Sequence, residues 1–381
     1  MKESKILLSN NEQRLTYYCI YIYVGSLNEK DNERGLAHFV EHMNMCFRKY
    51  DLLKECDNYL AYAITDYYST TYIIGMPWRD RKKGISVIDN ILKGTYIDQI
   101  FLEEVRQDIL SEIQDKNNDI ENELLDKIFF KTKYHGREPV GNIENIENYN
   151  IDEIKKFFLT WYQKENIKII CLDENQSNYN YKILKNNSNI QYKLKPTICN
   201  WNEKEIEIDK KRQKVRIVYK IEKEKYKIFF SIDCFLYSFM LEMLSENIEI
   251  FLNEKLNMNY ISCETKILSA VEDLWWVELN ENEYRKYEWN MIKKDFLDWI
   301  YEYWEEIVER CKTFAEHYNE FVSADYILER MKEEFIYGRK YLGIDKEKEI
   351  IDSFISSKDA MHVYTEFVKR ITNDDKVVIY Y

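Results

Sequence analysis

The sequence predicts an α+β protein of two domains, because the chain is long and its two halves show the same order of helices and strands. Its 381 residues exceed what one core of ordinary size accommodates. A hydrophobic fraction of 45% can fill two cores, and a charged fraction of 32% can cover them. A stretch rich in Asn, Lys and Gln, with little periodicity, separates the halves. We therefore expect an N-terminal domain at 1–174, a linker at 175–212 and a C-terminal domain at 213–381.

Runs of β-branched and aromatic residues predict strands, and apolar residues at helical spacing predict helices. In the first half, the order is strand 17–24, helix 33–47, strand 68–76, helices 85–92, 101–130 and 151–162, and strand 167–172. In the second half, it is strand 215–221, helix 229–256, strands 261–268 and 274–279, helices 289–311, 324–341 and 357–370, and strand 376–381. No residue-level repeat accompanies this shared order.

Charge and composition argue against several functional classes. The net charge is −13, and no Lys/Arg-rich run with interleaved aromatic residues occurs, which argues against nucleic-acid binding. No stretch approaches the ~18 apolar residues of a membrane span, and the first ten residues lack the apolar core of a secretory signal. The eight cysteines form no CxxC pair, as expected for reduced thiols. These features predict a cytoplasmic protein without a membrane span.

The motif with the clearest chemistry is His38-Phe39-Val40-Glu41-His42, within the predicted helix 33–47. Residues i and i+4 of a helix lie on one face, so both imidazoles can reach one ion while Glu41 shares their face. Two imidazoles and a carboxylate leave zinc a position for water, whose proton a nearby carboxylate can accept. The alternative is a helix with two solvated or core histidines, but the apolar face opposite favours a lined cavity. The motif predicts that His38 and His42 bind zinc and that Glu41 is the general base.

A catalytic zinc of this type needs a third protein ligand, and Glu112 is the candidate. It lies on the apolar stripe of the predicted helix 101–130, together with Val105. A carboxylate on a buried stripe is costly unless it is paired or bound to a cation. The alternative is a glutamate at the helix edge paired with a lysine. Asp108 and Asp115 flank the same face and are candidates to hydrogen-bond the ligands.

Five segments occur in a characteristic order along the N-terminal half. They are 24–26 (VGS), 35–43 (GLAHFVEHM), 61–72 (AYAITDYYSTTY), 108–113 (DILSEI) and 134–141 (YHGREPVG). This succession resembles the pitrilysin/insulinase family (M16), whose members are zinc peptidases with the inverted H-x-x-E-H motif. The chain looks like a small two-domain member of the bacterial type.

The resemblance implies a fold and a set of site residues. It implies two similar α/β-roll domains, each an antiparallel sheet packed by helices, which together make half of a clamshell. It also implies that Glu112 is the third zinc ligand. Ala61 and Tyr62 would border an edge strand to which a peptide substrate adds by main-chain hydrogen bonds. His135 lies in a loop and is expected to be structural.

Two departures from the family pattern affect the predicted mechanism. Where the family often carries a helper glutamate before the third ligand, this chain has Val105, with Glu104 beside it and off the face. Family members with a complete site also place an Arg seven residues before a Tyr to hold substrate carbonyls. Here Tyr260 occupies the Tyr position, but the Arg position is Asn253. The sequence therefore contains the residues of a zinc site and the tyrosine of the substrate clamp, but not the clamp arginine.

These residues predict a zinc metalloendopeptidase whose chamber is completed by a second chain. The partner would be a homologous M16-type subunit that supplies the Arg/Tyr pair, and a homodimer is the alternative. The substrate would be a peptide, with maturation of a ribosomally made precursor as one role. The competing class is a metal-free structural or peptide-binding subunit; its members usually lack the metal ligands, which are all present here.

Overall fold

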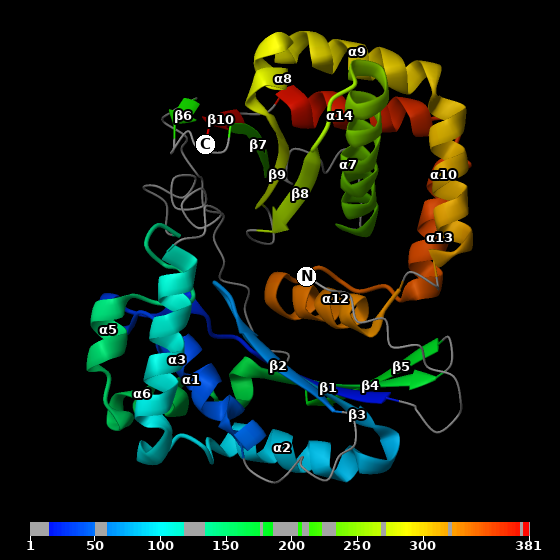
Figure 1. Ribbon diagram of the computed structural model, residues 1–381. Coiled ribbons are helices and arrows are strands. Elements are labelled where there is room, and N and C mark those ends of the chain that lie inside the picture. Colours follow the sequence, from blue (N-terminus) through cyan, green and yellow to red (C-terminus); the bar gives the residue numbers. More distant parts are fainter. Residues whose placement is uncertain are drawn as a thin grey trace. The chain divides into compact units, whose positions relative to one another are not determined.

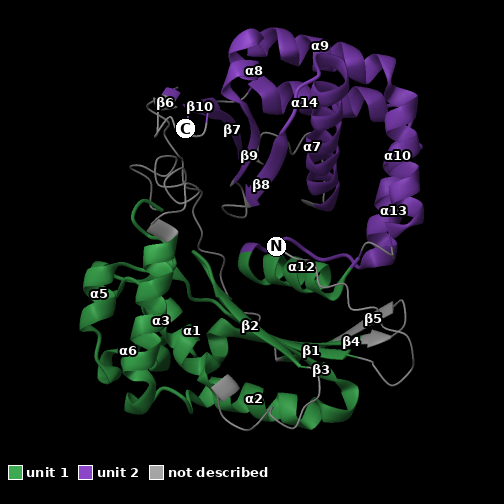
Figure 2. Ribbon diagram, viewed as in Figure 1, with its two compact units in different colours: residues 1–192, 323–336 green, residues 193–322, 337–381 purple. Residues whose placement is uncertain are grey.

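The computed structural model describes residues 15–49, 59–117, 134–175, 178–185, 205–207, 213–222, 234–267, 272–318, 322–373 and 376–380. The chain forms two compact units (Figure 2). Unit 1 comprises residues 1–192 and 323–336, and unit 2 comprises residues 193–322 and 337–381. Unit 1 is thus assembled from two separate stretches of the chain.

Unit 1 contains a five-stranded antiparallel sheet in the order β2-β3-β1-β4-β5. β1 is central, and its Ile20 pairs with Tyr72 on one side and with Ile169 on the other. Among the described strands, β2 pairs only with β3 and so forms an edge of the sheet. The strands are β1 (Leu15–Ile22), β2 (Leu60–Thr65), β3 (Thr70–Pro77), β4 (Ile167–Asn175) and β5 (Asn178–Lys185).

Helices cover one face of this sheet and build the core of unit 1 (Figure 1). Alternate residues of β1 point to this face because side chains along a strand alternate between its two faces. Tyr18, Ile20 and Ile22 therefore join the same buried cluster as Phe39 and Val40 of the first helix. The helices are α1 (Leu36–Met45), α2 (Arg81–Lys93), α3 (Gln99–Asn117), α5 (Ile143–Asn148) and α6 (Ile151–Trp161).

The opposite face of the unit 1 sheet is covered by α12 (Ala324–Tyr337), which comes from late in the sequence (Figure 1). The Tyr21 hydroxyl, on this face of β1, donates a buried hydrogen bond of 2.6 Å to the carbonyl of Leu328. The rings of Tyr21 and Phe335 lie 6.1 Å apart. The sheet of unit 1 therefore has helices on both faces, with α12 on the face opposite α1.

Unit 2 contains a second five-stranded sheet in the order β6-β10-β7-β9-β8. Its strands pair antiparallel except β6 and β10, which are parallel. The strands are β6 (Glu205–Glu207), β7 (Lys214–Glu222), β8 (Ser262–Ile267), β9 (Glu272–Asn280) and β10 (Lys376–Tyr380). The helices are α7 (Cys234–Leu256), α8 (Glu281–Lys286), α9 (Trp289–Glu302), α10 (Trp304–Glu316), α13 (Ile344–Ile355) and α14 (Ala360–Asn373).

The predicted α+β class, with helices packed on antiparallel sheets, is confirmed in both units. The compact units differ from the predicted division at 1–174 and 213–381 in two respects: residues 323–336 pack on unit 1, and unit 1 extends to residue 192. Within the predicted linker 175–212, the structure describes β5 and β6, and most of the remainder lies outside the described residues. The predicted helix 289–311 is interrupted at Tyr303, whose φ of −107° is not helical.

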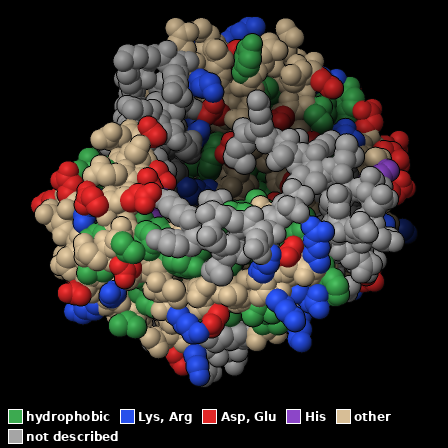
Figure 3. Space-filling model, turned by 60° about the horizontal axis from the view of Figure 1, so that its bottom comes forward, with side chains coloured by type: hydrophobic (Ala, Val, Ile, Leu, Met, Phe, Trp, Pro, Cys, Tyr) green, Lys and Arg blue, Asp and Glu red, His purple; other side chains and the backbone are tan. Residues whose placement is uncertain are grey.

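The surface is charged, as the composition predicts. On the face shown in Figure 3, acidic and basic side chains both occur, with hydrophobic side chains between them. Among the described helices, none is long and apolar enough to cross a membrane.

Candidate metal centre

Helix α1 presents the predicted metal motif, and its first turn is held in place by backbone packing. Gly35 precedes the helix with a φ of 90°, a conformation that favours glycine. A Cβ at Gly35 would lie 2.9 Å from the Cα of Gly141, so no side chain fits there. From this start, the apolar side of α1 enters the core, and His38 and Glu41 are also buried.

Glu29 caps the amino end of α1 with its side chain. Its two carboxylate oxygens accept hydrogen bonds of 2.8 Å each from the backbone N–H groups of Gly35 and Ala37. Burial raises the pKa of Glu29 to about 8, although these two donors and the nearby Arg137 pull it down. The Arg137 guanidinium donates to the carbonyl of Glu29 and to the carboxylate of Asp31. The segment 134–141 is thereby tied to the start of α1.

Helix α3 supplies Glu112 from the edge of its buried stripe. Val105, Ile109 and Ile113 are buried, whereas Glu112 is half-buried. Arg106 anchors the helix by donating to the backbone carbonyls of Ile146 and, at 2.7 Å, Tyr149. The face of α3 that carries Glu112 is thus fixed relative to the rest of unit 1.

Three other acidic side chains of α3 discussed above are exposed on the helix surface. They are Glu104, Asp108 and Asp115. The hypothesis that Asp108 and Asp115 hydrogen-bond the metal ligands stays a prediction.

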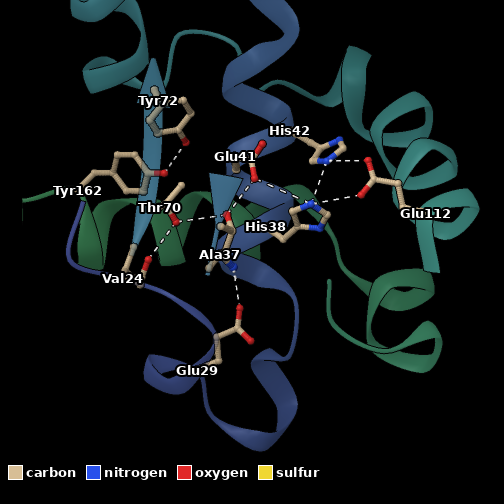
Figure 4. A network of polar contacts seen from close by, with 11 residues as sticks. Val24, Glu29, Ala37, His38, Glu41, His42, Thr70, Tyr72, Glu112 and Tyr162 are labelled. Atoms are coloured by element: carbon tan, nitrogen blue, oxygen red, sulfur yellow. Dashed lines mark hydrogen bonds and ion pairs between the residues drawn. The ribbon is translucent and has the colours of Figure 1, made fainter. Parts of the chain in front are cut away.

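The three predicted ligands converge at one point of unit 1 (Figure 4). The Nε2 atoms of His38 and His42 are 3.1 Å apart. The Glu112 carboxylate approaches both, with Oε2 at 3.5 Å from Nε2 of His38 and Oε1 at 3.4 Å from Nε2 of His42. Among the described residues, this is the group of His, Cys, Asp and Glu side chains whose donor atoms could share one ion.

The spacing of these donors fits zinc. Ligand atoms at ~2.0–2.1 Å from a tetrahedral zinc lie roughly 3.3 Å apart. The three observed separations of 3.1, 3.4 and 3.5 Å bracket that value. Two imidazoles with one carboxylate is also a donor set used by catalytic rather than structural zinc sites, which favour four protein ligands. The residues present therefore fit a catalytic zinc ion.

Glu41 lies beside the cluster without joining it. Its Oε2 is 3.9 Å from Nε2 of His38, and the Thr65 hydroxyl donates a 3.0 Å hydrogen bond to the same oxygen. Thr65 is the last residue of the edge strand β2. The predicted general base is thus held between the metal helix and the edge of the sheet.

Two buried tyrosine hydroxyl groups, of Tyr72 and Tyr162, lie near Glu41. The Tyr72 and Tyr162 hydroxyl oxygens are 2.6 Å apart, and the Asn44 amide donates to Tyr72 at 3.2 Å. Burial raises the pKa of both phenols, and the Glu41 charge adds to the effect. Both tyrosines are therefore neutral hydrogen-bonding groups at physiological pH.

The residues predicted to bind substrate lie in different units. Ala61 is buried in β2, and the half-buried Tyr62 donates a 3.0 Å hydrogen bond to Asp325 of α12. Tyr260 belongs to unit 2, where it is 87% exposed and has a positive φ of 58°. Asn253 is exposed on α7. Their roles in substrate binding stay predictions.

The remaining histidines lie outside the cluster. His135, His317 and His362 are all exposed, the last two on unit 2. Sequence reasoning did not single out Glu29 or Thr65, whose contacts join segments without a shared periodicity.

Residues 5–139 match the family model described as insulinase (peptidase family M16). This N-terminal stretch of the chain is therefore similar to the M16 peptidases. Stromal processing peptidase of Pisum sativum is 29% identical over 162 residues, which cover 40% of this chain and 13% of the relative. Mitochondrial-processing peptidase subunit beta of Mus musculus is 26% identical over 153 residues, covering 38% and 31%. The matched segments thus span well under half the length of these relatives.

Solved structures with the same fold include PqqL, a periplasmic protease of Escherichia coli. Its crystal structure matches 96% of this chain and 44% of its own, with a TM-score of 0.73 and 15% identity. A structure of the first half of PqqL matches 97% of this chain and 87% of its own, with a TM-score of 0.71 and 13% identity. In fold, this chain corresponds to one half of the longer PqqL chain.

Proposed function

We propose that this chain is a zinc metalloendopeptidase of the H-x-x-E-H type. The observation that carries the proposal is the convergence of His38, His42 and Glu112 within hydrogen-bonding range of one another, with Glu41 beside them. The similarity of residues 5–139 to the M16 family supports it.

Each residue has a distinct role in this proposal. His38, His42 and Glu112 hold the metal, which when bound would polarise the scissile carbonyl and acidify water. Glu41 accepts the proton from the attacking water on its carboxylate and passes it to the leaving amine. The Glu41 carboxylate lies 3.9 Å from Nε2 of His38. It is therefore close enough to accept a proton from the attacking water without itself being a metal ligand.

The substrate is proposed to be a peptide in extended conformation. β2 forms one edge in the described part of the sheet, and Ala61 and Tyr62 lie in the first half of that strand. A peptide can add there by main-chain hydrogen bonds, which select extended shape before side-chain identity. Maturation of a ribosomally made precursor peptide is a role consistent with such a site.

A second chain is proposed to complete the substrate clamp. Asn253 stands where an arginine is expected, and a neutral amide cannot give the forked, charge-assisted hydrogen bonds of a guanidinium. The mouse relative is named as one subunit, and the fold corresponds to one half of PqqL. A homologous M16-type subunit that supplies an Arg/Tyr pair would complement Tyr260 here, and a homodimer is the alternative.

The site of action is proposed to be the cytoplasm, on the composition of the chain alone. Relatives include enzymes named as chloroplastic and periplasmic, so this assignment needs its own experiment, such as fractionation of cells that express the tagged protein.

Hydrolysis of a peptide library by the purified protein tests the proposed activity. The protein is assayed after loading with zinc, after chelation and after addition of zinc back, alone and with candidate M16-type partners. We expect cleavage that chelation abolishes and zinc restores. Peptide binding without cleavage in every combination would instead identify a metal-independent binding subunit.

A further inference from the structure

Thr65 lies at a junction between the edge strand and the metal helix. It is the last residue of β2, pairs with Thr70 of β3, and its half-buried side chain points to the face on which α1 packs. There its hydroxyl reaches Oε2 of Glu41 at 3.0 Å. The side chain of an edge-strand residue thus contacts the proposed general base.

In this hydrogen bond, the Thr65 hydroxyl is the donor and the Glu41 carboxylate is the acceptor. An ionised carboxylate accepts only, so Thr65 donates its proton to Glu41. Thr70, labelled in Figure 4, donates its own proton to the carbonyl of Val24 at 2.9 Å and lies 3.4 Å from the Thr65 hydroxyl. Thr70 can therefore only accept from Thr65, and at 3.4 Å it is a weaker acceptor than the Glu41 carboxylate at 3.0 Å, which takes the Thr65 proton.

The turn that follows Thr65 is held by hydrogen bonds and close backbone packing. The Asp66 carboxylate accepts hydrogen bonds of 2.7 Å from the backbone N–H groups of Tyr68 and Ser69. The carbonyl of Asp66 accepts from the N–H of Ser26, and a Cβ at Gly25 would lie 2.2 Å from that oxygen. This packing fixes the end of β2 and so fixes the hydroxyl that reaches Glu41.

We propose that Thr65 is a positioning residue that holds the carboxylate of Glu41 in its working orientation. This inference rests on the proposed function, since it assigns Glu41 as the base. It adds that the strand to which the peptide would bind also orients the group that activates water. A peptide paired with β2 would therefore meet a base whose position is set by the same strand.

Three variants separate a positioning role from a purely structural one. Thr65→Val keeps the shape and removes the donor, whereas Thr65→Ser keeps the donor. Thr71→Val is the matched control, because Thr71 is a buried threonine of β3 whose hydroxyl has no hydrogen-bond partner among the described residues. In the assembly that hydrolyses peptide, we expect Thr65→Val to lower kcat about 10- to 100-fold with little change in KM. Thr65→Ser and Thr71→Val should stay within about three-fold of the unmodified protein.

The position of Glu41 provides a readout that does not depend on activity. In crystal structures of the metal-free proteins, Thr65→Val should leave the Glu41 carboxylate turned away from its place beside His38, while Thr65→Ser should retain it. An unmoved carboxylate in Thr65→Val, or equal loss of kcat in the Ser and Val variants, would overturn the inference. If no protein hydrolyses peptide, the proposed function fails, and the crystal structures still decide whether Thr65 orients Glu41.

Discussion

The two units share one framework and differ in what their helices carry. The strand order β2-β3-β1-β4-β5 of unit 1 corresponds to β8-β9-β7-β10-β6 of unit 2. β1 and β7 each lie in the middle of their sheet, and β2 and β8 each lie at one edge. Along the chain, α1 lies between β1 and β2, and α7 lies between β7 and β8.

The corresponding helices even share a buried asparagine. Asn44 of α1 donates to the Tyr72 hydroxyl at 3.2 Å, and Asn247 of α7 donates to the Tyr364 hydroxyl at 3.1 Å. Yet α7 contains no histidine, whereas α1 carries two histidines and Glu41. The fold therefore supports both units, and the proposed chemistry depends on a few side chains added to one of them.

Replacement of the proposed base Glu41, in unit 1, should cause the largest loss of peptide hydrolysis. In Glu41→Gln, the amide is isosteric but cannot accept the proton from water, so hydrolysis should fall by roughly 10²–10⁴-fold while zinc and peptide remain bound. Glu104→Gln, on the exposed face of α3, is the control. Near-normal turnover in Glu41→Gln would show that another group is the base.

The contribution of unit 2 to substrate binding can be tested at Asn253, which stands where the clamp arginine is expected. Because Asn253 lacks the guanidinium, the isolated chain should be weak on peptides and gain at least about 10-fold with a homologous chain that carries Arg and Tyr. Asn253→Arg should recover part of this gain if the chain self-associates, and Asn253→Lys should recover less. The measurement is peptide cleavage together with mass in solution. Full activity from a strict monomer would refute the two-chain hypothesis, and full activity from a homodimer would refute its heterodimeric form.

Helix caps offer a comparison of stability between the units. Glu29 caps α1 from a buried position, whereas Asn280 caps the short helix α8 by accepting from the N–H of Asn282. Glu29→Ala leaves two donors near the core without acceptors and should lower the free energy of unfolding by about 1–3 kcal/mol. Asn280→Ala should cost about 0.5–1 kcal/mol. Equal losses, measured by chemical denaturation, would contradict the importance given to the buried cap.

The Glu29 carboxyl should also give unit 1 a dependence on pH. Its pKa rises on folding from 4.5 to about 8, so between these values the folded chain holds a proton that the unfolded chain has released. The contribution of this group to stability is therefore greatest at the acidic end of that window and is lost as pH rises toward 8. Glu29→Gln removes this titration and should flatten the fall of Tm between these pH values, by several degrees for a stability change on the order of a few kcal/mol. Parallel Tm profiles for the two proteins would contradict the assignment.

Local patterns in the sequence predicted the group of His38, His42 and Glu112, but they could not predict contacts between distant segments of the chain. The i, i+4 spacing brings His38 and His42 to one face of α1, and an apolar stripe placed Glu112 on the inner side of α3. Thr65 reaches Glu41 from a strand 24 residues away in sequence, and no periodicity links the two. Similarly, the pattern of 324–341 predicted a helix but could not indicate that it packs on the sheet of unit 1.

The central claim is that unit 1 holds one catalytic zinc ion, and metal content tests it most directly. Purified protein, equilibrated with zinc and then freed of excess metal, is analysed for zinc per chain alongside His42→Ala and the control His362→Ala, an exposed histidine of α14. The account predicts one zinc per chain in the unmodified protein and in His362→Ala, and most of it lost from His42→Ala. Stoichiometric zinc in His42→Ala, or none in the unmodified protein, would contradict the account.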